Sequence, residues 1–103
     1  MRIAENQNDP TLSMYEVREF ARIVNPLGLH ARPAAALVQA VIGFDADVRI
    51  QLNGNEINAK SIMGLLTLAA GQGTEIEVIC RGTDADAALD AVLKLVAAGF
   101  GEK

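Results

Sequence analysis

The sequence has one cysteine, one histidine and few aromatic residues. The single thiol, Cys80, has no partner for an internal disulfide, and its place in an apolar, strand-like run predicts a buried, unreactive side chain. One histidine and one cysteine are a poor ligand set for a transition metal, so we expect no bound metal and no other cofactor. The core must be built from Val, Ile, Leu and Ala, because aromatic residues make up only 4% of the chain.

The chain also has no excess of positive charge and no long hydrophobic run. A formal net charge of −4 argues against general nucleic-acid binding, which needs clustered Lys and Arg. No apolar run approaches the roughly 20 residues that span a bilayer, and the N-terminus has no continuous apolar segment of the secretory type. No P-loop is present, so ATP is not expected as a co-substrate. These absences predict a cytoplasmic protein without membrane insertion.

The length of 103 residues is enough for one compact domain and too short for two. Residues 1–14 are polar, with Pro10 and several amides, and are predicted to form a flexible N-terminal extension. Residues 15–103 then form the domain, which we expect to be a monomer.

In the first half of the domain, the spacing of hydrophobic residues changes between the two-residue period of a strand and the 3.6-residue period of a helix. Residues 15–24 are rich in strand-forming types, and from Ala31 the pattern becomes helical. Alternation over 47–52 predicts a half-buried strand, and the Asn53-Gly54 pair predicts a hairpin with a returning strand at 56–58. The expected buried stripe of the helix is formed by Ala34, Leu37, Val38, Val41 and Ile42.

The second half of the domain is predicted to contain a helix, a strand and a helix. Ser61 is a candidate N-cap for a short helix that ends near residue 69 or 70, and residues 74–80 form the last strand. Thr83 is a candidate N-cap for a final helix that stops near Gly99. The order strand, helix, strand, strand, helix, strand, helix predicts an α+β open-faced sandwich, although periodicity alone does not separate it from a ferredoxin-like domain.

The lone histidine, His30, directly precedes the first helical pattern. A helix begins with backbone N–H groups that lack intrahelical partners and attract anions. Arg32 follows two residues later, and a guanidinium group matches the geometry of phosphate. Pro33 fits a first helical turn, where its missing N–H costs nothing. Spacing alone leaves two interpretations open, a phosphorylatable histidine and an ordinary capping or surface residue.

Two motifs separate these interpretations. The segment 27–35, LGLHARPAA, resembles the active-site signature of the histidine-containing phosphocarrier (HPr) family of the bacterial phosphotransferase system. The segment 60–64, KSIMG, resembles the regulatory-serine segment of the same family, in the expected order. The resemblance covers about residues 16–99. It implies a four-stranded antiparallel sheet covered on one face by three helices.

The resemblance also implies the chemistry. Members of this family carry a phosphoryl group between other proteins and do not turn over a substrate by themselves, so we expect a carrier and not an enzyme. His30 accepts the phosphoryl group on Nδ1 from phosphorylated enzyme I and passes it to an enzyme IIA, and Arg32 is the arginine beside the phosphate. A neutral imidazole, with an ordinary pKa of about 6.5, is nucleophilic near physiological pH.

Further residues are assigned by the same resemblance. Ser61 is expected to be phosphorylated by an ATP-dependent HPr kinase/phosphorylase, although capping alone would also explain a serine there. Gln39 departs from relatives that carry a lysine on the outer face of the first helix, which predicts weaker steering of acidic partners. The residues expected to meet partner proteins are Leu27, Gly28, Ala31, Ile62, Met63, Leu66 and Thr67, and for Leu66 a core position is nearly as well supported.

Two alternatives stay open at this point. One is a carrier of the nitrogen-related branch, with the same chemistry and a regulatory role. Pro33 mildly favours the sugar-type or general carrier. The other alternative is a regulatory binding protein that no longer carries phosphate. The presence of His30 with Arg32 disfavours it.

Overall fold

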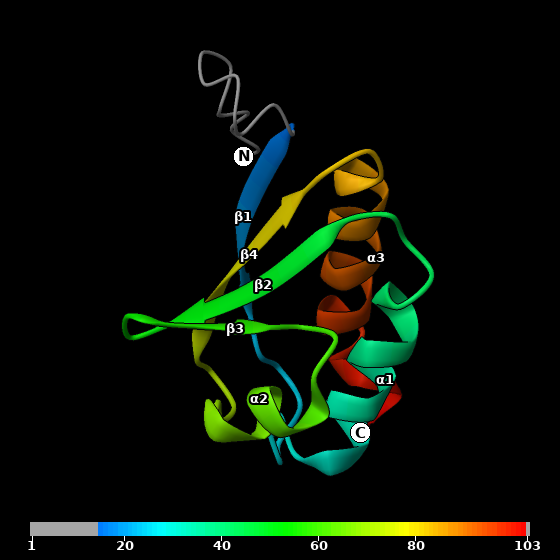
Figure 1. Cartoon of the computed structure of the whole chain (residues 1–103). Coiled ribbons are helices and arrows are strands. Elements are labelled where there is room, and N and C mark those ends of the chain that lie inside the picture. The colour runs from blue at the N-terminus through cyan, green and yellow to red at the C-terminus, as the bar shows by residue number, and fades with distance from the viewer. Residues whose placement is uncertain (1–14, 103) are drawn as a thin grey trace.

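The structure, a computed structural model, describes residues 15–102 (Figure 1). The extension predicted for residues 1–14 lies outside the described residues, as does Lys103. The elements are β1 (Glu16–Arg22), α1 (Ala31–Val41), β2 (Asp47–Leu52), β3 (Asn55–Asn58), α2 (Ile62–Thr67), β4 (Glu75–Arg81), α3 (Ala85–Ala97) and a 3₁₀ turn, η2 (Gly99–Gly101). The predicted order of strands and helices is confirmed.

The four strands form one antiparallel sheet in the order β1-β4-β2-β3. The last strand therefore enters the middle of the sheet, between β1 and β2. Helix α3 packs on β1, β4 and β2, α2 packs beside β3, and α1 packs against both other helices (Figure 1). This arrangement leaves one face of the sheet open, and the predicted α+β open-faced sandwich is confirmed.

The core lies between the sheet and the helices, where the two predicted periodicities meet. Alternate residues of each strand point toward the helices, and every third or fourth residue of α1 and α3 points back. Cys80 is fully buried among them, as predicted. The largest fully buried side chains are Val17, Ile23, Leu37, Val41, Val48, Ile50, Leu65, Ile76, Val78, Leu89 and Val92, together with Glu16.

The ends of the first two helices differ from the prediction. Ile42 was predicted in the buried stripe of α1, but α1 ends at Val41 and the Ile42 side chain is 57% exposed at the C-cap. Helix α2 ends at Thr67, two or three residues earlier than predicted, because Ala69 takes the left-handed conformation with φ of 51°. A helix cannot continue through a left-handed residue. These predictions were wrong in the last turn, where the tertiary fold redirects the chain.

The start of α3 is also different. The N-cap is Asp84 and not the predicted Thr83, and the Asp84 side chain makes no capping hydrogen bond. Its carboxylate instead accepts the backbone N–H of Asp45 at 2.7 Å, and its own N–H donates to the Asp45 carbonyl at 3.0 Å. The side chain therefore joins the start of α3 to the loop before β2.

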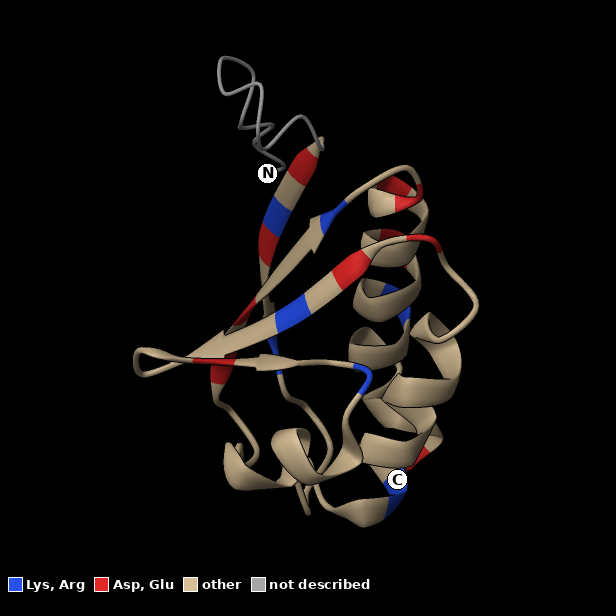
Figure 2. Cartoon of the chain, viewed as in Figure 1, with Lys and Arg blue, Asp and Glu red and all other residues tan. Residues whose placement is uncertain are grey.

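Charged residues gather on the open face of the sheet, whereas no Asp, Glu, Lys or Arg occurs in α2 or in the loop that follows it, up to Thr74 (Figure 2). The Glu16 side chain is only 2% exposed and accepts hydrogen bonds from Arg18 at 2.8 Å and from Arg81. Burial opposes ionisation of Glu16, but the hydrogen bonds and charges of both arginines outweigh it and lower its pKa. Ile79, which breaks the polar alternation of β4, is buried on this face.

Candidate functional site

The loop before His30 is held against the end of α2. The Leu29 N–H donates to the Ala70 carbonyl at 2.8 Å. Gly28 has φ of 68°, and a Cβ at this position would lie closer than 3.0 Å to the same carbonyl oxygen. Gly28 was predicted to line the approach to the site, but it is buried. Its role here is to let the two loops pack closely.

His30 occupies the N-cap of α1, as its position before the helical pattern predicted. Its backbone is extended, its carbonyl accepts the Ala34 N–H at 2.9 Å, and its side chain makes no capping hydrogen bond. Pro33 has no N–H, so the amides of Ala31 and Arg32 remain as donors without an intrahelical acceptor. The His30 side chain is 37% exposed, which leaves the ring accessible from solvent.

One partner of this ring, Glu102, was not predicted from the sequence. The His30 Nε2 lies 2.9 Å from Oε2 and 3.1 Å from Oε1 of Glu102. Seventy-two positions separate the two residues in the sequence, and no local pattern connects them. Asn25, also missed, donates through Nδ2 to Glu102 Oε1 at 2.9 Å and to the Gly28 carbonyl at 2.8 Å. The site therefore draws on both ends of the domain.

The Glu102 carboxylate is held in its ionised form. The hydrogen bond from Asn25 lowers its pKa most, burial opposes this, and the hydrogen bond and charge of His30 and the charge of Arg32 lower the pKa further. Arg32 itself is exposed and makes no hydrogen bond or ion pair within residues 15–102. The predicted pair of His30 and Arg32 thus shares the start of α1, but no hydrogen bond joins the two side chains.

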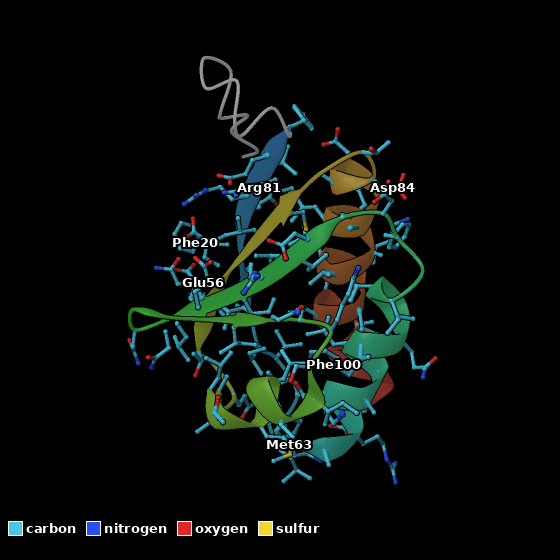
Figure 3. All side chains as sticks on the ribbon, viewed as in Figure 1. Phe20, Glu56, Met63, Arg81, Asp84 and Phe100 are labelled. Carbon is cyan, nitrogen blue, oxygen red and sulfur yellow. The ribbon has the colours of Figure 1, made fainter. Side chains whose placement is uncertain are left out.

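An exposed, mostly apolar surface borders the histidine. Leu27 and Met63 are each 75% exposed, and Figure 3 shows Met63 at the end of the molecule formed by α2 and the start of α1. The side chain of Leu65 is fully buried, so α2 has one apolar contact in the core and several outside it. We call the exposed residues the docking surface: Leu27, Ala31, Ile62, Met63, Leu66 and Thr67.

Ser61 caps the helix that carries this surface. Its hydroxyl oxygen accepts the Gly64 N–H at 3.1 Å, which confirms the predicted N-cap. The side chain is half-buried, with exposed Ile62 and Met63 directly after it. A change at this hydroxyl would therefore act at the border of the docking surface.

Other kinds of site are not found in the described part of the chain. Residues 15–102 contain no group of three or more His, Cys, Asp or Glu side chains placed to hold a metal ion. In the same range, no helix combines the length and the apolar character that a membrane span requires. The chemistry of this end of the molecule rests on one imidazole, one carboxylate, free amides and an arginine.

The fold and the site together define a class of protein: a small open-faced sandwich with an accessible histidine at the start of its first helix. Comparison with known proteins agrees. Residues 17–98 match the family described as "PTS HPr component phosphorylation site". The chain belongs to the HPr family, a family of phosphocarrier proteins and not of enzymes.

Individual relatives are similar over most of the chain. The phosphocarrier protein HPr of Cupriavidus necator is 46% identical over 80 residues, which is 78% of this chain and 90% of that protein. The HPr of Treponema pallidum is 44% identical over 82 residues, covering 80% and 93% of the two chains. The crystal structure of HPr from Thermoanaerobacter tengcongensis superposes with a TM-score of 0.80 at 36% identity, covering 84% and 97%.

Proposed function

We propose that this protein carries a phosphoryl group on His30, between phosphorylated enzyme I and an enzyme IIA of the phosphotransferase system. The observation that carries the proposal is the state of the ring: it is exposed, held at Nε2 and without a hydrogen bond at Nδ1 among the described residues. A nitrogen with a free lone pair beside unpaired amides is suited to accept a phosphoryl group. The protein would act as a cytoplasmic monomer.

The transfer step exchanges one P–N bond for another. The Nδ1 lone pair of His30 attacks phosphorus while the P–N bond to the donor histidine breaks, and that bonding pair returns to the donor nitrogen. The amides of Ala31 and Arg32 and the dipole of α1 then stabilise the phosphate by about 0.3–1 kcal/mol, and up to ~2 kcal/mol in favourable geometry. Arg32 adds charge-assisted hydrogen bonds when it turns toward the phosphate. This modest stabilisation suits a carrier, because tighter binding would oppose onward transfer.

The docking surface supports contact with more than one partner. Its side chains are exposed and largely apolar, and no Asp, Glu, Lys or Arg occurs from Ser61 to Thr74 (Figure 2). Met63, with its flexible thioether, adapts to different partners. We assign enzyme I and the IIA protein to this one surface, since both must reach the same histidine. Exposed apolar groups beside a reactive group are typical of interaction sites.

Regulation through Ser61 is part of the proposal. Phosphorylation by an HPr kinase/phosphorylase would add about −1.5 to −2 charge beside Ile62 and Met63. A partner that buries this apolar border would then have to desolvate a dianion, so transfer from enzyme I to His30 would slow. The half-buried position of the Ser61 hydroxyl at the border supports this mechanism.

The test is transfer of label from phosphoenolpyruvate through enzyme I. We expect acid-labile, base-stable label on the wild-type protein and none on folded His30→Ala. Persistent labelling of His30→Ala would exclude the site. Delivery of the label to sugar-branch and nitrogen-branch IIA proteins identifies the acceptor.

The same assay tests Ser61 with two variants. Ser61→Asn and Ser61→Asp both keep a good N-cap, but only the second adds a charge. Slower labelling of Ser61→Asp alone is the expected result. Equal rates for the two variants would count against regulation by charge at this position.

A further inference from the structure

One ring nitrogen of His30 is held by the end of the domain. Because the pKa of Glu102 is lowered, its carboxylate is ionised at neutral pH and can only accept hydrogen bonds. The hydrogen in the contact of 2.9 Å must therefore be on Nε2 of His30. In a neutral ring this leaves the lone pair on Nδ1, which has no hydrogen-bonding partner within residues 15–102.

The carboxylate is itself fixed by a buried amide. Asn25 is 2% exposed, and its Nδ2 donates both to Glu102 and to the Gly28 carbonyl. These two acceptors determine which way the amide faces, and its Oδ1 has no hydrogen-bond partner. A buried polar atom without a partner is unfavourable, so the orientation of Asn25 is set by what Nδ2 binds. Asn25 thus connects the loop before His30 to Glu102.

A tight turn brings Glu102 to this position. Gly99, Phe100 and Gly101 all have positive φ, at 63°, 57° and 76°. A phenylalanine is strained in this conformation, but Phe100 is only 9% exposed and is anchored in the core beside α1 and α3 (Figure 3). Glu102 lies outside residues 17–98, the segment that matches the family. The turn is built at a cost in backbone strain, and it delivers a carboxylate to the ring.

We propose that Glu102, held by Asn25, is a positioning residue that fixes the Nε2–H tautomer of His30 and makes Nδ1 the phosphoryl acceptor. This inference rests on the proposed carrier function.

The charge balance of the transfer explains the benefit. When the Nδ1 lone pair forms the P–N bond and the donor takes back its own bonding pair, no proton leaves His30. Positive charge then spreads over the ring to the Nε2–H, 2.9 Å from the carboxylate that stabilises it. In onward transfer the proton on Nε2 lets the ring leave as a neutral imidazole. Glu102 therefore assists transfer in both directions.

The experiment uses the single histidine of the chain, which gives one pair of ring signals in a histidine labelled with ¹⁵N. At about pH 9, where imidazoles are neutral, the wild-type protein should show a protonated Nε2 and an unprotonated Nδ1. In Glu102→Gln both signals should move toward those of a free histidine, and labelling by enzyme I should slow on the order of tenfold. The phosphorylated wild-type protein should show ³¹P coupling to Nδ1.

Glu56→Gln is the matched control, because it removes one exposed carboxylate on β3, away from the end of the molecule that carries Met63 (Figure 3). It should leave the ring signals and the labelling rate unchanged. Coupling of ³¹P to Nε2, or identical ring signals in the wild-type protein and Glu102→Gln, would overturn the inference. If His30→Ala is still labelled, the carrier assignment fails instead, whereas the tautomer measurement on the unphosphorylated protein stands by itself.

Discussion

At the scale of single residues, the site depends on positions where the neighbouring chain leaves no choice of side chain. Gly28 is the clearest case, because its φ of 68° and the nearby Ala70 carbonyl both exclude a Cβ. The adjacent hydrogen bond from Leu29 to Ala70 then fixes where His30 enters α1. Glycine at this position is therefore required by the loop packing that places the histidine.

Gly28→Ala should lower the free energy of unfolding by at least about 2 kcal/mol, from left-handed strain and from the clash with Ala70. Gly73→Ala is the matched control, since Gly73 has φ of 86° but no atom within 4 Å of the added Cβ. Urea unfolding of both variants separates the effect of the clash from that of left-handed backbone strain, which both variants share. Equal losses in the two variants would show that the close approach to Ala70 is unimportant.

At the scale of elements, α2 has only six residues, one of which is buried in the core while most of the others are exposed. Leu65 anchors it in the core, while its other apolar side chains extend the docking surface. A helix this short has little stability by itself and depends on its cap and on tertiary packing. Ser61 supplies the cap and Leu65 the packing, so the exposed residues of α2 are not needed for its stability.

Leu65→Ala should therefore lower stability, whereas Leu66→Ala should lower the affinity for partner proteins. Leu65→Ala should cost about 2–5 kcal/mol of stability, whereas Leu66→Ala should stay within about 0.5 kcal/mol of the wild-type value. Leu66→Ala should instead weaken the apparent affinity for enzyme I about fivefold, as loss of an interface contact does. The measurements are urea unfolding and phosphotransfer at varied enzyme I concentration. An unchanged affinity for both enzyme I and IIA would remove Leu66 from the docking surface.

At the scale of the whole molecule, charged side chains are unevenly distributed over the surface. The open face of the sheet holds an ion-paired network around Glu16, while α2 and the loop that follows it carry no charged residue (Figure 2). The ion pairs satisfy the charged side chains on the face of the sheet that no helix covers. We therefore expect partner proteins to bind at the end of the molecule that carries the docking surface.

The network predicts a pH dependence of stability. The pKa of Glu16 is lowered from its ordinary value of 4.5 in the folded state, so its contribution is present above that value and is lost as pH falls through the folded pKa. Glu16→Gln should cost roughly 1–3 kcal/mol at neutral pH, toward the lower end because both arginines are partly exposed. Below pH 4.5 the difference from the wild-type protein should shrink. Urea unfolding at both pH values checks this, with exposed Glu75→Gln as the control. A constant difference would contradict the lowered pKa.

Local patterns in the sequence determined the elements, the class of fold and the place of His30, because hydrophobic period, turn residues and helix starts act over a few residues. Two local motifs also sufficed to indicate the family. The contact between Glu102 and His30, the buried Glu16 and the left-handed Ala69 were decided only by the tertiary structure. Each depends on atoms that the chain brings together from distant positions, and no local pattern encodes which groups will meet there.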